Sequence, residues 1–325
     1  MEYIRLKGVE KQLSRIGLGS QPIGYHTKEL GRATIQEALD QGITLIDTAP
    51  AYGRGRAEEL LGEALKDYDR EELVIASKAG LEPRNESLVR NSSPDWIQKE
   101  IKKSLERLQT DYIDIYHIHW PDPLVPQKET AKAMKELKAE GTIRAIGLSN
   151  YSVEQIREFT QEAAIDTLQN PYNIFERGIE RDVLPYSQKN DITVLAYRSL
   201  CQGLLTGQLQ ADADYRSHVV KKDDPKYQQP RYRHYLEAVK KLDELAKEKY
   251  DRGVLDLAIQ WILDNPRTIA LWGAWKPEYL KPVSEVLGWK IDNETRQEID
   301  SIVAETIKDP VGPEFLAPPT RLPRD

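Results

Sequence analysis

The sequence predicts an α/β protein: a (β/α)8 TIM barrel with an N-terminal β-hairpin and an irregular C-terminal tail, in one domain over residues 1–325. Short apolar segments alternate with amphipathic segments, which is the order of βαβ units around a parallel sheet. About eight units in roughly 300 residues match the size of such a barrel. The alternative is a doubly wound sheet, which is disfavoured because no G-x-G-x-x-G follows the first strand.

The first half of the chain is expected to supply the hairpin and four barrel strands. Residues 3–6 and 11–13 should pair as the hairpin. Apolar runs that end in glycine or a polar residue predict barrel strands at residues 16–19, 43–47, 73–78 and 113–119. Amphipathic periodicity predicts helices at residues 33–42, 57–67, 93–110 and 129–141. In the third helix Ser93 is the expected N-cap and Pro94 begins the first turn.

The second half continues the same alternation. Strands are expected at residues 143–149, 166–170, 192–197 and 268–273. Helices are expected at residues 152–163, 179–190, 235–250, 254–265 and 293–306. The polar stretch 208–230 should leave the barrel as a long connection, either a flap over a cofactor or a surface loop. The proline-rich tail from residue 309 onward should be irregular.

Composition favours a protein that acts on small molecules. The net charge is −7 and no basic block stands out, which argues against nucleic acid or an anionic membrane as the main partner. No apolar run reaches the roughly 20 residues of a membrane helix, and residues 1–15 lack a signal-peptide pattern. The single cysteine, Cys201, cannot form an internal disulfide, so a cytoplasmic location is expected. No pattern decides the oligomeric state, and a monomer is slightly favoured.

Ionisable residues follow three of the predicted strands. Asp47 ends one strand with Tyr52 close behind it, Lys78 ends the next, and His119 ends the third. Because the carboxyl ends of parallel strands share one edge, these side chains should lie close together. A lysine on a strand buried on both faces is seldom merely solvated, and Asp47 is its candidate partner. Taken singly, Asp47 could equally be a helix cap and Tyr52 a packed aromatic.

The pair His117 and His119 admits a metal site as an alternative. Residues two apart on a strand face the same side, so both imidazoles could bind zinc. A zinc site requires further ligands, and the other histidines follow no recognisable strand: His26, His218 and His234. The sequence therefore predicts no metal, with His119 functional and His117 structural.

The ordered motifs resemble those of the aldo-keto reductase superfamily. Residues 42–65, GITLIDTAPAYGRGRAEELLGEAL, resemble the segment around its catalytic aspartate and tyrosine. The later motifs follow in the family's order: LVIASK, YHIHWPDP, IRAIGLSN, LQNPYN and LAYRSLCQGLLTG. The strings DPLVP, SLCQGLLTG and DPVGPEFLAPPTR are most similar to the bacterial general-stress-protein branch. The resemblance implies an NADPH-dependent oxidoreductase that reduces aldehydes, and some ketones, in a stress response.

The resemblance implies a catalytic tetrad of Asp47, Tyr52, Lys78 and His119. Tyr52 would be the general acid that protonates the carbonyl oxygen, with its pKa lowered by Lys78. Asp47 would hold Lys78 charged, and His119 would orient the carbonyl. The nicotinamide would supply the hydride.

The resemblance also implies a set of coenzyme contacts. Tyr197 would stack on the nicotinamide ring. Ser149, Asn150 and Gln169 would hold its carboxamide, which needs both donors and acceptors, and Asn and Gln supply both. The loop 198–202 would follow the pyrophosphate. The full implied set is Ser20, Gln21, Asp47, Ser149, Asn150, Gln169, Tyr197, Arg198, Ser199, Leu200, Cys201, Gln202, Gly273 and Lys276.

The segment expected to bind the adenosine 2′-phosphate departs from the family pattern. Trp275 replaces one of two expected basic residues beside Lys276, Tyr279 stands where glutamine is common, and Val283 replaces an asparagine that contacts adenine. Phosphate prefers guanidinium or ammonium partners, and one lost charge-assisted bond costs about 1–3 kcal/mol. The expected result is weak NADPH binding with a relaxed preference over NADH. Trp275 could instead stack on the adenine.

The substrate side is expected to be aromatic. Trp120, directly after His119, could form a pocket wall opposite Tyr25 or His26, or could be a structural residue of the barrel rim. An alternative function on the same barrel is a cofactor-binding redox sensor with slow turnover. The intact tetrad favours the enzyme, and the altered phosphate segment keeps the sensor as the alternative.

Overall fold

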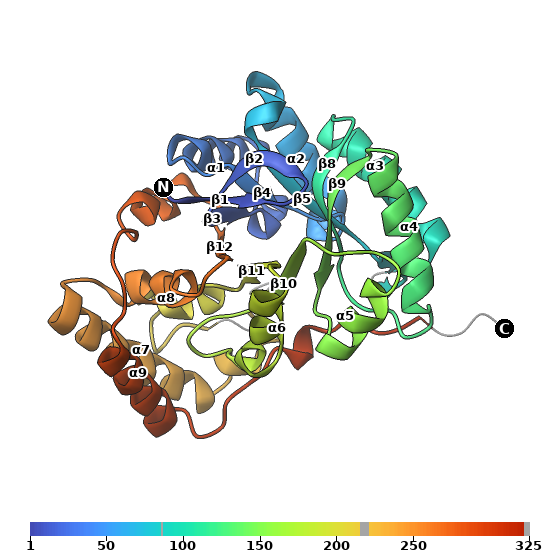
Figure 1. Ribbon diagram of the computed structural model, residues 1–325. Helices are drawn as coiled ribbons and strands as arrows, with labels where there is room; N and C mark the ends of the chain where they lie inside the picture. The colour runs from blue at the N-terminus through green and yellow to red at the C-terminus, as the bar shows by residue number, and fades with distance from the viewer. Residues whose placement is uncertain (86, 215–220, 322–325) are drawn as a thin grey trace.

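The computed structural model describes residues 1–85, 87–214 and 221–321, and eight parallel strands in it close into a barrel (Figure 1). The order around the barrel is β10-β11-β12-β3-β4-β5-β8-β9. The strands are β3 (Ile16–Gly19), β4 (Leu45–Asp47), β5 (Val74–Ala79), β8 (Ile113–Ile118), β9 (Ile143–Ser149), β10 (Thr167–Pro171), β11 (Thr193–Tyr197) and β12 (Thr268–Gly273). The predicted (β/α)8 barrel is confirmed, with each strand within two residues of its expected bounds.

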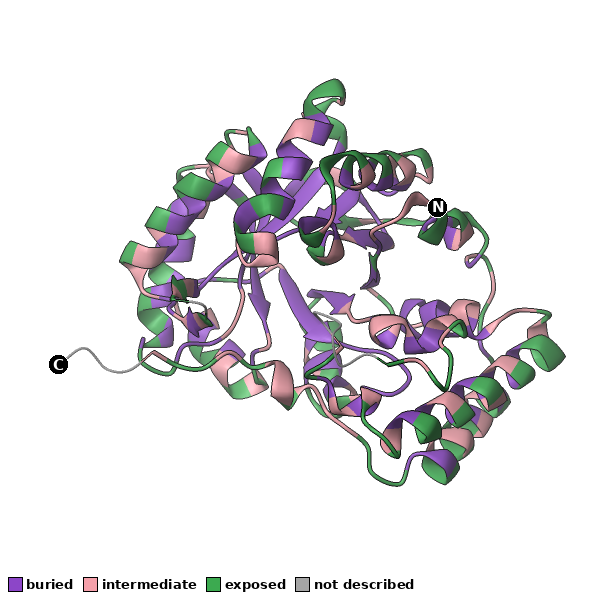
Figure 2. Ribbon diagram, turned by 180° about the vertical axis from the view of Figure 1, so that it is seen from behind, coloured by how far each residue is buried: buried purple, intermediate pink, exposed green. Residues whose placement is uncertain are grey.

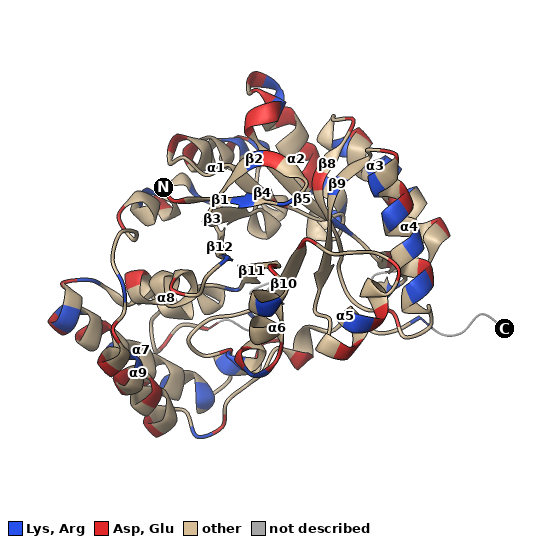
Figure 3. Ribbon diagram, in the orientation of Figure 1, with Lys and Arg blue, Asp and Glu red and all other residues tan. Residues whose placement is uncertain are grey.

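Helices surround the barrel and turn their polar faces outward (Figure 2). They are α1 (Lys28–Asp40), α2 (Arg56–Ala64), α3 (Pro94–Leu108), α4 (Gln127–Ala139), α5 (Val153–Thr160), α6 (Val183–Lys189), α7 (Arg231–Tyr250), α8 (Val254–Leu263) and α9 (Asn293–Thr306). α1 begins five residues before its predicted start because Thr27 caps it through a bond from Leu30 N. Acidic and basic residues intermix over these helices (Figure 3), as the absence of a basic block in the sequence predicts.

The N-terminal hairpin closes the amino-terminal end of the barrel. β1 (Tyr3–Leu6) and β2 (Val9–Ser14) pair antiparallel, as predicted. Leu6, Val9 and Leu13 are buried in one cluster with the barrel residues Leu45 and Val74. Burial of these apolar side chains holds the hairpin across the strand starts.

A group of charges ties the same hairpin to the barrel, and we call Lys11, Arg70, Tyr112 and Asp114 the basal cluster. Lys11 Nζ and Arg70 Nη2 lie 3.0 Å and 2.6 Å from the two oxygens of Asp114, which is 1% exposed. Both cations also lie over the Tyr112 ring, at 5.0 Å and 4.2 Å from its centroid. The basal cluster therefore joins β2 to the connections that precede β5 and β8.

The connection from β5 to α3 contains a second hairpin that the sequence analysis did not predict. β6 (Leu81–Arg84) pairs antiparallel with β7 (Ser87–Arg90). The C-terminal tail docks on it, since Arg90 N donates to Pro319 O at 3.0 Å and Arg90 Nε donates to Pro318 O at 2.8 Å. Up to residue 321, where the described part ends, the tail is largely irregular, as expected, and contains one short 3-10 turn at Glu314–Leu316.

No helix in the described ranges is long and apolar enough to cross a membrane. The polar connection 208–230 leaves the barrel between β11 and α7, and its residues 215–220 lie outside the described residues. The described part that follows returns to the barrel at two places: Lys221 approaches Gly203, and Asp224 pairs with Arg198.

Candidate active site

The barrel brings the four predicted tetrad residues to its carboxyl-terminal end. Asp47 is the last residue of β4, Lys78 lies near the end of β5, and His119 directly follows β8. These three strands are neighbours, because β4 pairs with β5 and β5 with β8. Tyr52 begins the 3-10 turn that follows β4.

The Lys78 ammonium is the centre of the group. Its Nζ lies 2.8 Å and 2.7 Å from the Asp47 oxygens and 3.1 Å from Tyr52 Oη. It also donates to Thr48 O at 2.9 Å, a contact that the sequence did not suggest. Lys78 is fully buried, so its charge depends on these partners rather than on water.

Two glycines allow the loop that carries Tyr52 to pack closely. Gly53 has a φ of 59°, and a Cβ there would lie 2.4 Å from Gly24 O. A Cβ on Gly24 would in turn lie 3.1 Å from the Tyr52 carbonyl. Only glycine fits at Gly53 without moving the backbone, and the close approach holds Tyr52 beside Lys78.

The electrostatics of Tyr52 differ from the expectation. Burial raises the pKa of Tyr52 well above 10, and the nearby Asp47 carboxylate adds to this. The pKa of Tyr52 is therefore raised and not lowered as expected, because burial of the phenol has the largest effect on it. Burial also lowers the pKa of Lys78, and Asp47 opposes that effect. Tyr52 is therefore a protonated phenol across the physiological range, the form that a proton donor requires.

His119 is a neutral imidazole beside the phenol. Burial lowers its pKa well below 6.5, with further contributions from the Lys78 charge and from His117. Its ring meets the Tyr52 ring edge to face, with the centroids 6.1 Å apart. A neutral imidazole keeps one N–H donor, which suits a group that binds a carbonyl oxygen.

His117 has a structural position below the tetrad. It is fully buried, and its Nε2 lies 3.0 Å from Thr167 Oγ1. A Cβ on Gly147 would lie 2.1 Å from its ring, so the strand behind it must carry glycine. Burial lowers the pKa of His117 to about 3. Among the described residues no group of three His, Cys, Asp or Glu could hold a metal ion.

The residues expected to hold the carboxamide lie next to the tetrad. Gln169 donates to Asp47 Oδ1 at 2.7 Å. Asn150, in the left-handed region at φ 64°, donates to His119 O at 3.0 Å. Tyr197 Oη donates to Asn150 Oδ1 at 2.7 Å. Gln169 thus links β10 to β4, and Asn150 links the ends of β8, β9 and β11, contacts that the sequence alone did not reveal.

The 198–202 loop turns several of its side chains inward. Ser199 Oγ donates to Ala196 O, and Cys201 is fully buried. Arg198 is also buried, in ion pairs with Glu176 and Asp224 that the sequence analysis missed. The loop backbone and the Gln202 side chain are therefore the groups of this loop that remain available to bind a ligand.

The donors and acceptors at this end fit a nicotinamide nucleotide. Ser20 Oγ, Asn170 Oδ1 and Gln202 Oε1 are buried without a hydrogen-bond partner within the described parts of the chain. Buried polar atoms are normally paired, so three unpaired groups around one barrel mouth indicate a polar ligand. Gln21, exposed after β3, stands next to the first of these groups in the chain.

The segment expected to bind the adenosine phosphate is aromatic. Trp275 stacks on His26 with the centroids 4.3 Å apart and 13° between the planes. Lys276 Nζ lies 4.3 Å from the centroid of the Trp275 ring. One face of Trp275 is therefore covered before any ligand binds. Val283 is fully buried in the core, and Gly273 is exposed at the end of β12.

Trp120, the residue expected to form a wall of the substrate pocket, lies directly after His119 at the barrel mouth. Trp120 is half-buried, and the Arg90 guanidinium lies 5.4 Å from its ring centroid. His26 lies against Trp275 and Tyr25 is 49% exposed. The guanidinium places a positive charge beside the Trp120 ring.

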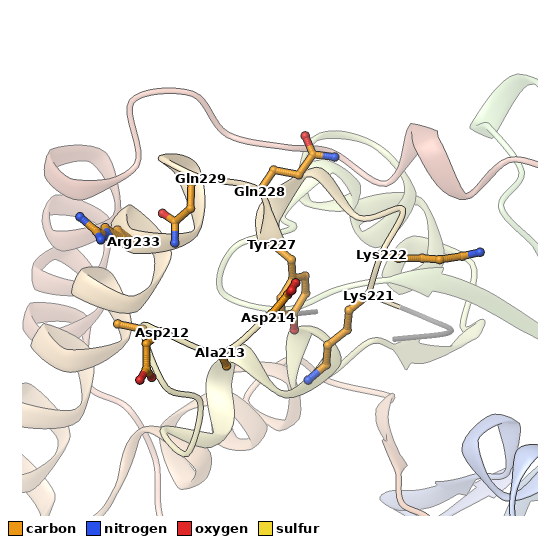
Figure 4. A pocket seen from close by; sticks show the side chains of 10 residues that line it. Asp212, Ala213, Asp214, Lys221, Lys222, Tyr227, Gln228, Gln229 and Arg233 are labelled. Atoms are coloured by element: carbon orange, nitrogen blue, oxygen red, sulfur yellow. The ribbon is translucent and has the colours of Figure 1, made fainter. Parts of the chain in front are cut away.

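A cavity of about 530 Å³ lies along the 208–230 connection rather than at the tetrad (Figure 4). Its lining mixes acids with bases, among them Asp212, Asp214, Lys221 and Arg233. Lys221 approaches the barrel loops, since its Nζ would lie 3.8 Å from a Cβ on Gly203.

Comparison with known proteins identifies a family and several related chains. The model of the aldo/keto reductase family matches residues 15–304. Aldo-keto reductase YhdN of Bacillus subtilis is 50% identical over 328 residues, with 99% of each chain covered. NADH-specific methylglyoxal reductase of Escherichia coli is 36% identical, with 86% of this chain and 92% of the relative covered.

Solved structures show the same fold. The glycerol dehydrogenase AKR11B4 from Gluconobacter oxydans superposes with a TM-score of 0.88 at 40% identity, covering 97% of this chain and 99% of the other. An aldo-keto reductase from Klebsiella pneumoniae in complex with NADPH superposes with a TM-score of 0.73 at 27% identity, covering 93% and 94%. Both likenesses extend over the whole barrel.

Proposed function

This chain belongs to the aldo/keto reductase family, and we propose that it reduces aldehydes, and some ketones, to alcohols with NADPH. The observation that carries the proposal is the buried contact of Lys78 with Asp47 and Tyr52, with neutral His119 beside the phenol. This arrangement supplies a proton donor and a second hydrogen-bond donor at one point of the barrel mouth.

In the proposed reaction each residue of the tetrad has one part. When bound, the reduced nicotinamide supplies the hydride that adds to the carbonyl carbon. The Tyr52 hydroxyl donates its proton to the carbonyl oxygen, and His119 donates a hydrogen bond to the same oxygen. The phenolate that Tyr52 leaves is stabilised by the Lys78 ammonium 3.1 Å away. Asp47 keeps that buried ammonium charged by bonding to it through both carboxylate oxygens.

The coenzyme side favours NADPH with a relaxed preference over NADH. The amides Asn150 and Gln169 would hold the carboxamide, Tyr197 would stack on the ring, and the backbone of the 198–202 loop would meet the pyrophosphate. Lys276 is the one basic residue between Gly273 and Tyr279, so the 2′-phosphate would meet a single ammonium. Related chains include both a structure with NADPH and an enzyme named NADH-specific, which supports an intermediate preference here.

The likeness to a methylglyoxal reductase and a glycerol dehydrogenase supports small carbonyl compounds and their alcohols as substrates. The Arg90 guanidinium beside Trp120 favours substrates with oxygen-bearing groups next to the carbonyl. The buried single cysteine, Cys201, suits a reducing cytoplasm. We further infer that the enzyme is a monomer with one domain over residues 1–325, and that it has a role in a stress response.

The test is multiple-turnover oxidation of NADPH, and separately of NADH, with a panel of aldehydes, ketones and quinones. We expect alcohol formation in step with coenzyme oxidation, and a loss of about 10²–10⁴-fold in kcat for Tyr52→Phe. Tight coenzyme binding with no turnover on any member of the panel would reject the reductase and favour the redox sensor.

A further inference from the structure

Four charged side chains form a closed ring at the base of the 198–202 loop, and we call Glu176, Arg198, Asp224 and Lys226 the charge ring. Arg198 Nε lies 3.1 Å from Glu176 Oε2, and its Nη2 lies 2.5 Å from Asp224 Oδ2. Lys226 Nζ lies 2.9 Å from Glu176 Oε1 and 3.3 Å from Asp224 Oδ1. Each cation therefore bridges both carboxylates, and the ring has no net charge.

The charge ring is removed from water. Its four side chains are between 0% and 5% exposed. The Phe315 ring of the C-terminal tail covers both cations, at 5.4 Å from the Arg198 guanidinium and 5.0 Å from Lys226 Nζ. A buried ion network contributes little net stability compared with apolar side chains of the same volume. Stability alone therefore does not explain why these four charges are buried here.

The segment that the ring holds is conformationally unfavourable. Arg198, Cys201 and Gln202 have left-handed φ values of 60°, 46° and 54°, which residues with side chains rarely adopt. The surroundings over-determine this conformation. Asn173 donates to Arg198 O at 3.0 Å, and Tyr227 Oη donates to Gln202 O at 2.9 Å.

Asp224, Lys226 and Tyr227 lie on the returning part of the 208–230 connection. We propose that Asp224 and Lys226 are positioning residues that lock this connection onto the 198–202 loop and so hold the loop ready for the coenzyme. The inference rests on the proposed function in that the loop is taken to bind the coenzyme pyrophosphate. A loop built before binding pays no ordering cost on association, so loss of the ring weakens affinity more than turnover.

The test is the dissociation constant for NADPH, measured by tryptophan quenching, in Asp224→Asn. Loss of this carboxylate leaves two buried cations against Glu176 alone. We expect at least tenfold weaker binding, with kcat at saturating NADPH within threefold of the wild type. The control is Asp309→Asn, the same change in a carboxylate 74% exposed and paired with Arg231 on α7, where binding should be unchanged.

Two further variants separate positioning from general stability. Asp224→Asn combined with Lys226→Met makes the ring neutral again, and we expect NADPH affinity to recover to within threefold of the wild type. Tyr227→Phe keeps the ring and removes the hydroxyl that donates to Gln202 O at 2.9 Å and to Cys201 O at 3.4 Å. We expect it to weaken NADPH binding about threefold, which tests the proposal even if the single Asp224 variant does not fold. Lower melting temperatures with unchanged NADPH affinity in all these variants would overturn the proposal.

Because the NADPH dissociation constant is measured separately from turnover, failure of this inference can be distinguished from failure of the proposed function. A wild-type protein that binds NADPH but reduces no carbonyl compound would reject the reductase and leave the binding comparison intact. Failure of the wild type to bind NADPH would overturn both.

Discussion

The two ends of the barrel each hold a buried cluster of charges, but the clusters serve different segments. At the amino-terminal end the basal cluster gathers two cations on Asp114 beneath the Tyr112 ring, and ties the hairpin to the strands. At the carboxyl-terminal end the charge ring joins two cations and two carboxylates beneath Phe315, beside the 198–202 loop. The same interactions thus support closure of the barrel at one end and the geometry of a binding loop at the other.

The proposed tetrad sharpens this contrast, because in the proposed reaction a buried ion pair takes part in the chemistry. Lys78 and Asp47 are as deeply buried as the charge ring, yet Lys78 also contacts the Tyr52 phenol, the proposed proton donor. Location along the strand axis, rather than the type of interaction, therefore predicts whether a substitution will affect turnover, binding or stability.

Lys78→Met should show the largest effect. It removes the charge that stabilises the Tyr52 phenolate and leaves the Asp47 carboxylate buried with Gln169 as its remaining side-chain donor. We expect kcat to fall about 10³-fold and unfolding free energy to fall by roughly 3 kcal/mol. Steady-state kinetics and urea denaturation give the two values.

The matched control combines Lys78→Met with Asp47→Asn. It removes both charges and keeps an acceptor for Gln169, so stability should return while kcat stays low. Recovery of kcat in the double variant would contradict the role assigned to Lys78.

Asp114→Asn, at the other end of the barrel, should lower stability while leaving turnover and NADPH binding nearly unchanged. It removes the buried carboxylate that Lys11 and Arg70 share, and leaves Lys11 only the exposed Glu71 carboxylate 3.9 Å away. We expect a loss of roughly 3 kcal/mol of unfolding free energy. Since the basal cluster lies at the end of the barrel opposite the tetrad, kcat and the NADPH dissociation constant should stay within twofold of the wild type. A tenfold change in NADPH affinity would break the comparison between the two ends.

The barrel interior between the two ends should respond to pH. His117 is neutral when folded because burial lowers its pKa to about 3, while the unfolded chain titrates near 6.5. Below pH 6.5 the unfolded state therefore binds an extra proton, and stability falls as pH falls toward 3. At pH 5 this group alone should cost about 2 kcal/mol relative to pH 8.

Denaturation of the wild type and of His117→Gln at both pH values isolates this contribution. The amide can still bond to Thr167 but does not titrate, so the variant should lose about 2 kcal/mol less on acidification. Equal losses in both proteins would show that His117 titrates normally when folded.

Most of the barrel, and the grouping of the four candidate side chains at its carboxyl-terminal end, could be predicted because their signals are local. Asp47, Lys78 and His119 each follow a short apolar run, and a run buried on both faces has few alternatives to a barrel strand. Parallel strands then bring their ends together without further information. The raised pKa of Tyr52 could not be predicted, since it depends on how completely the finished fold buries the phenol.

The charge ring and the β6–β7 hairpin had no local signal. Asp224 and Glu176 lie in polar connections, and their partners come from segments remote in sequence. Likewise, Arg90 is held by Pro318 and Pro319, more than 200 residues away. Polar contacts of this kind are set by tertiary packing, and single-sequence periodicity does not report them.

Trp275→Arg should give the smallest effect, at the outer edge of the carboxyl-terminal end. The structure shows Trp275 stacked on His26 with Lys276 above its ring, so the wild-type segment offers a 2′-phosphate one ammonium. A guanidinium adds a charge-assisted bond, worth about 1–2 kcal/mol to NADPH and nothing to NADH. We expect NADPH affinity to rise about tenfold, with NADH affinity within twofold of the wild type.

Trp275→Leu is the control for loss of the stack alone. It removes the aromatic contact with His26 without adding charge, so NADPH and NADH should change by the same factor. A selective loss of NADPH affinity in Trp275→Leu would mean that the ring itself helps to recognise the phosphate end. The altered segment would then bind NADPH selectively through the Trp275 ring, and the proposed relaxed preference for NADPH over NADH would be wrong.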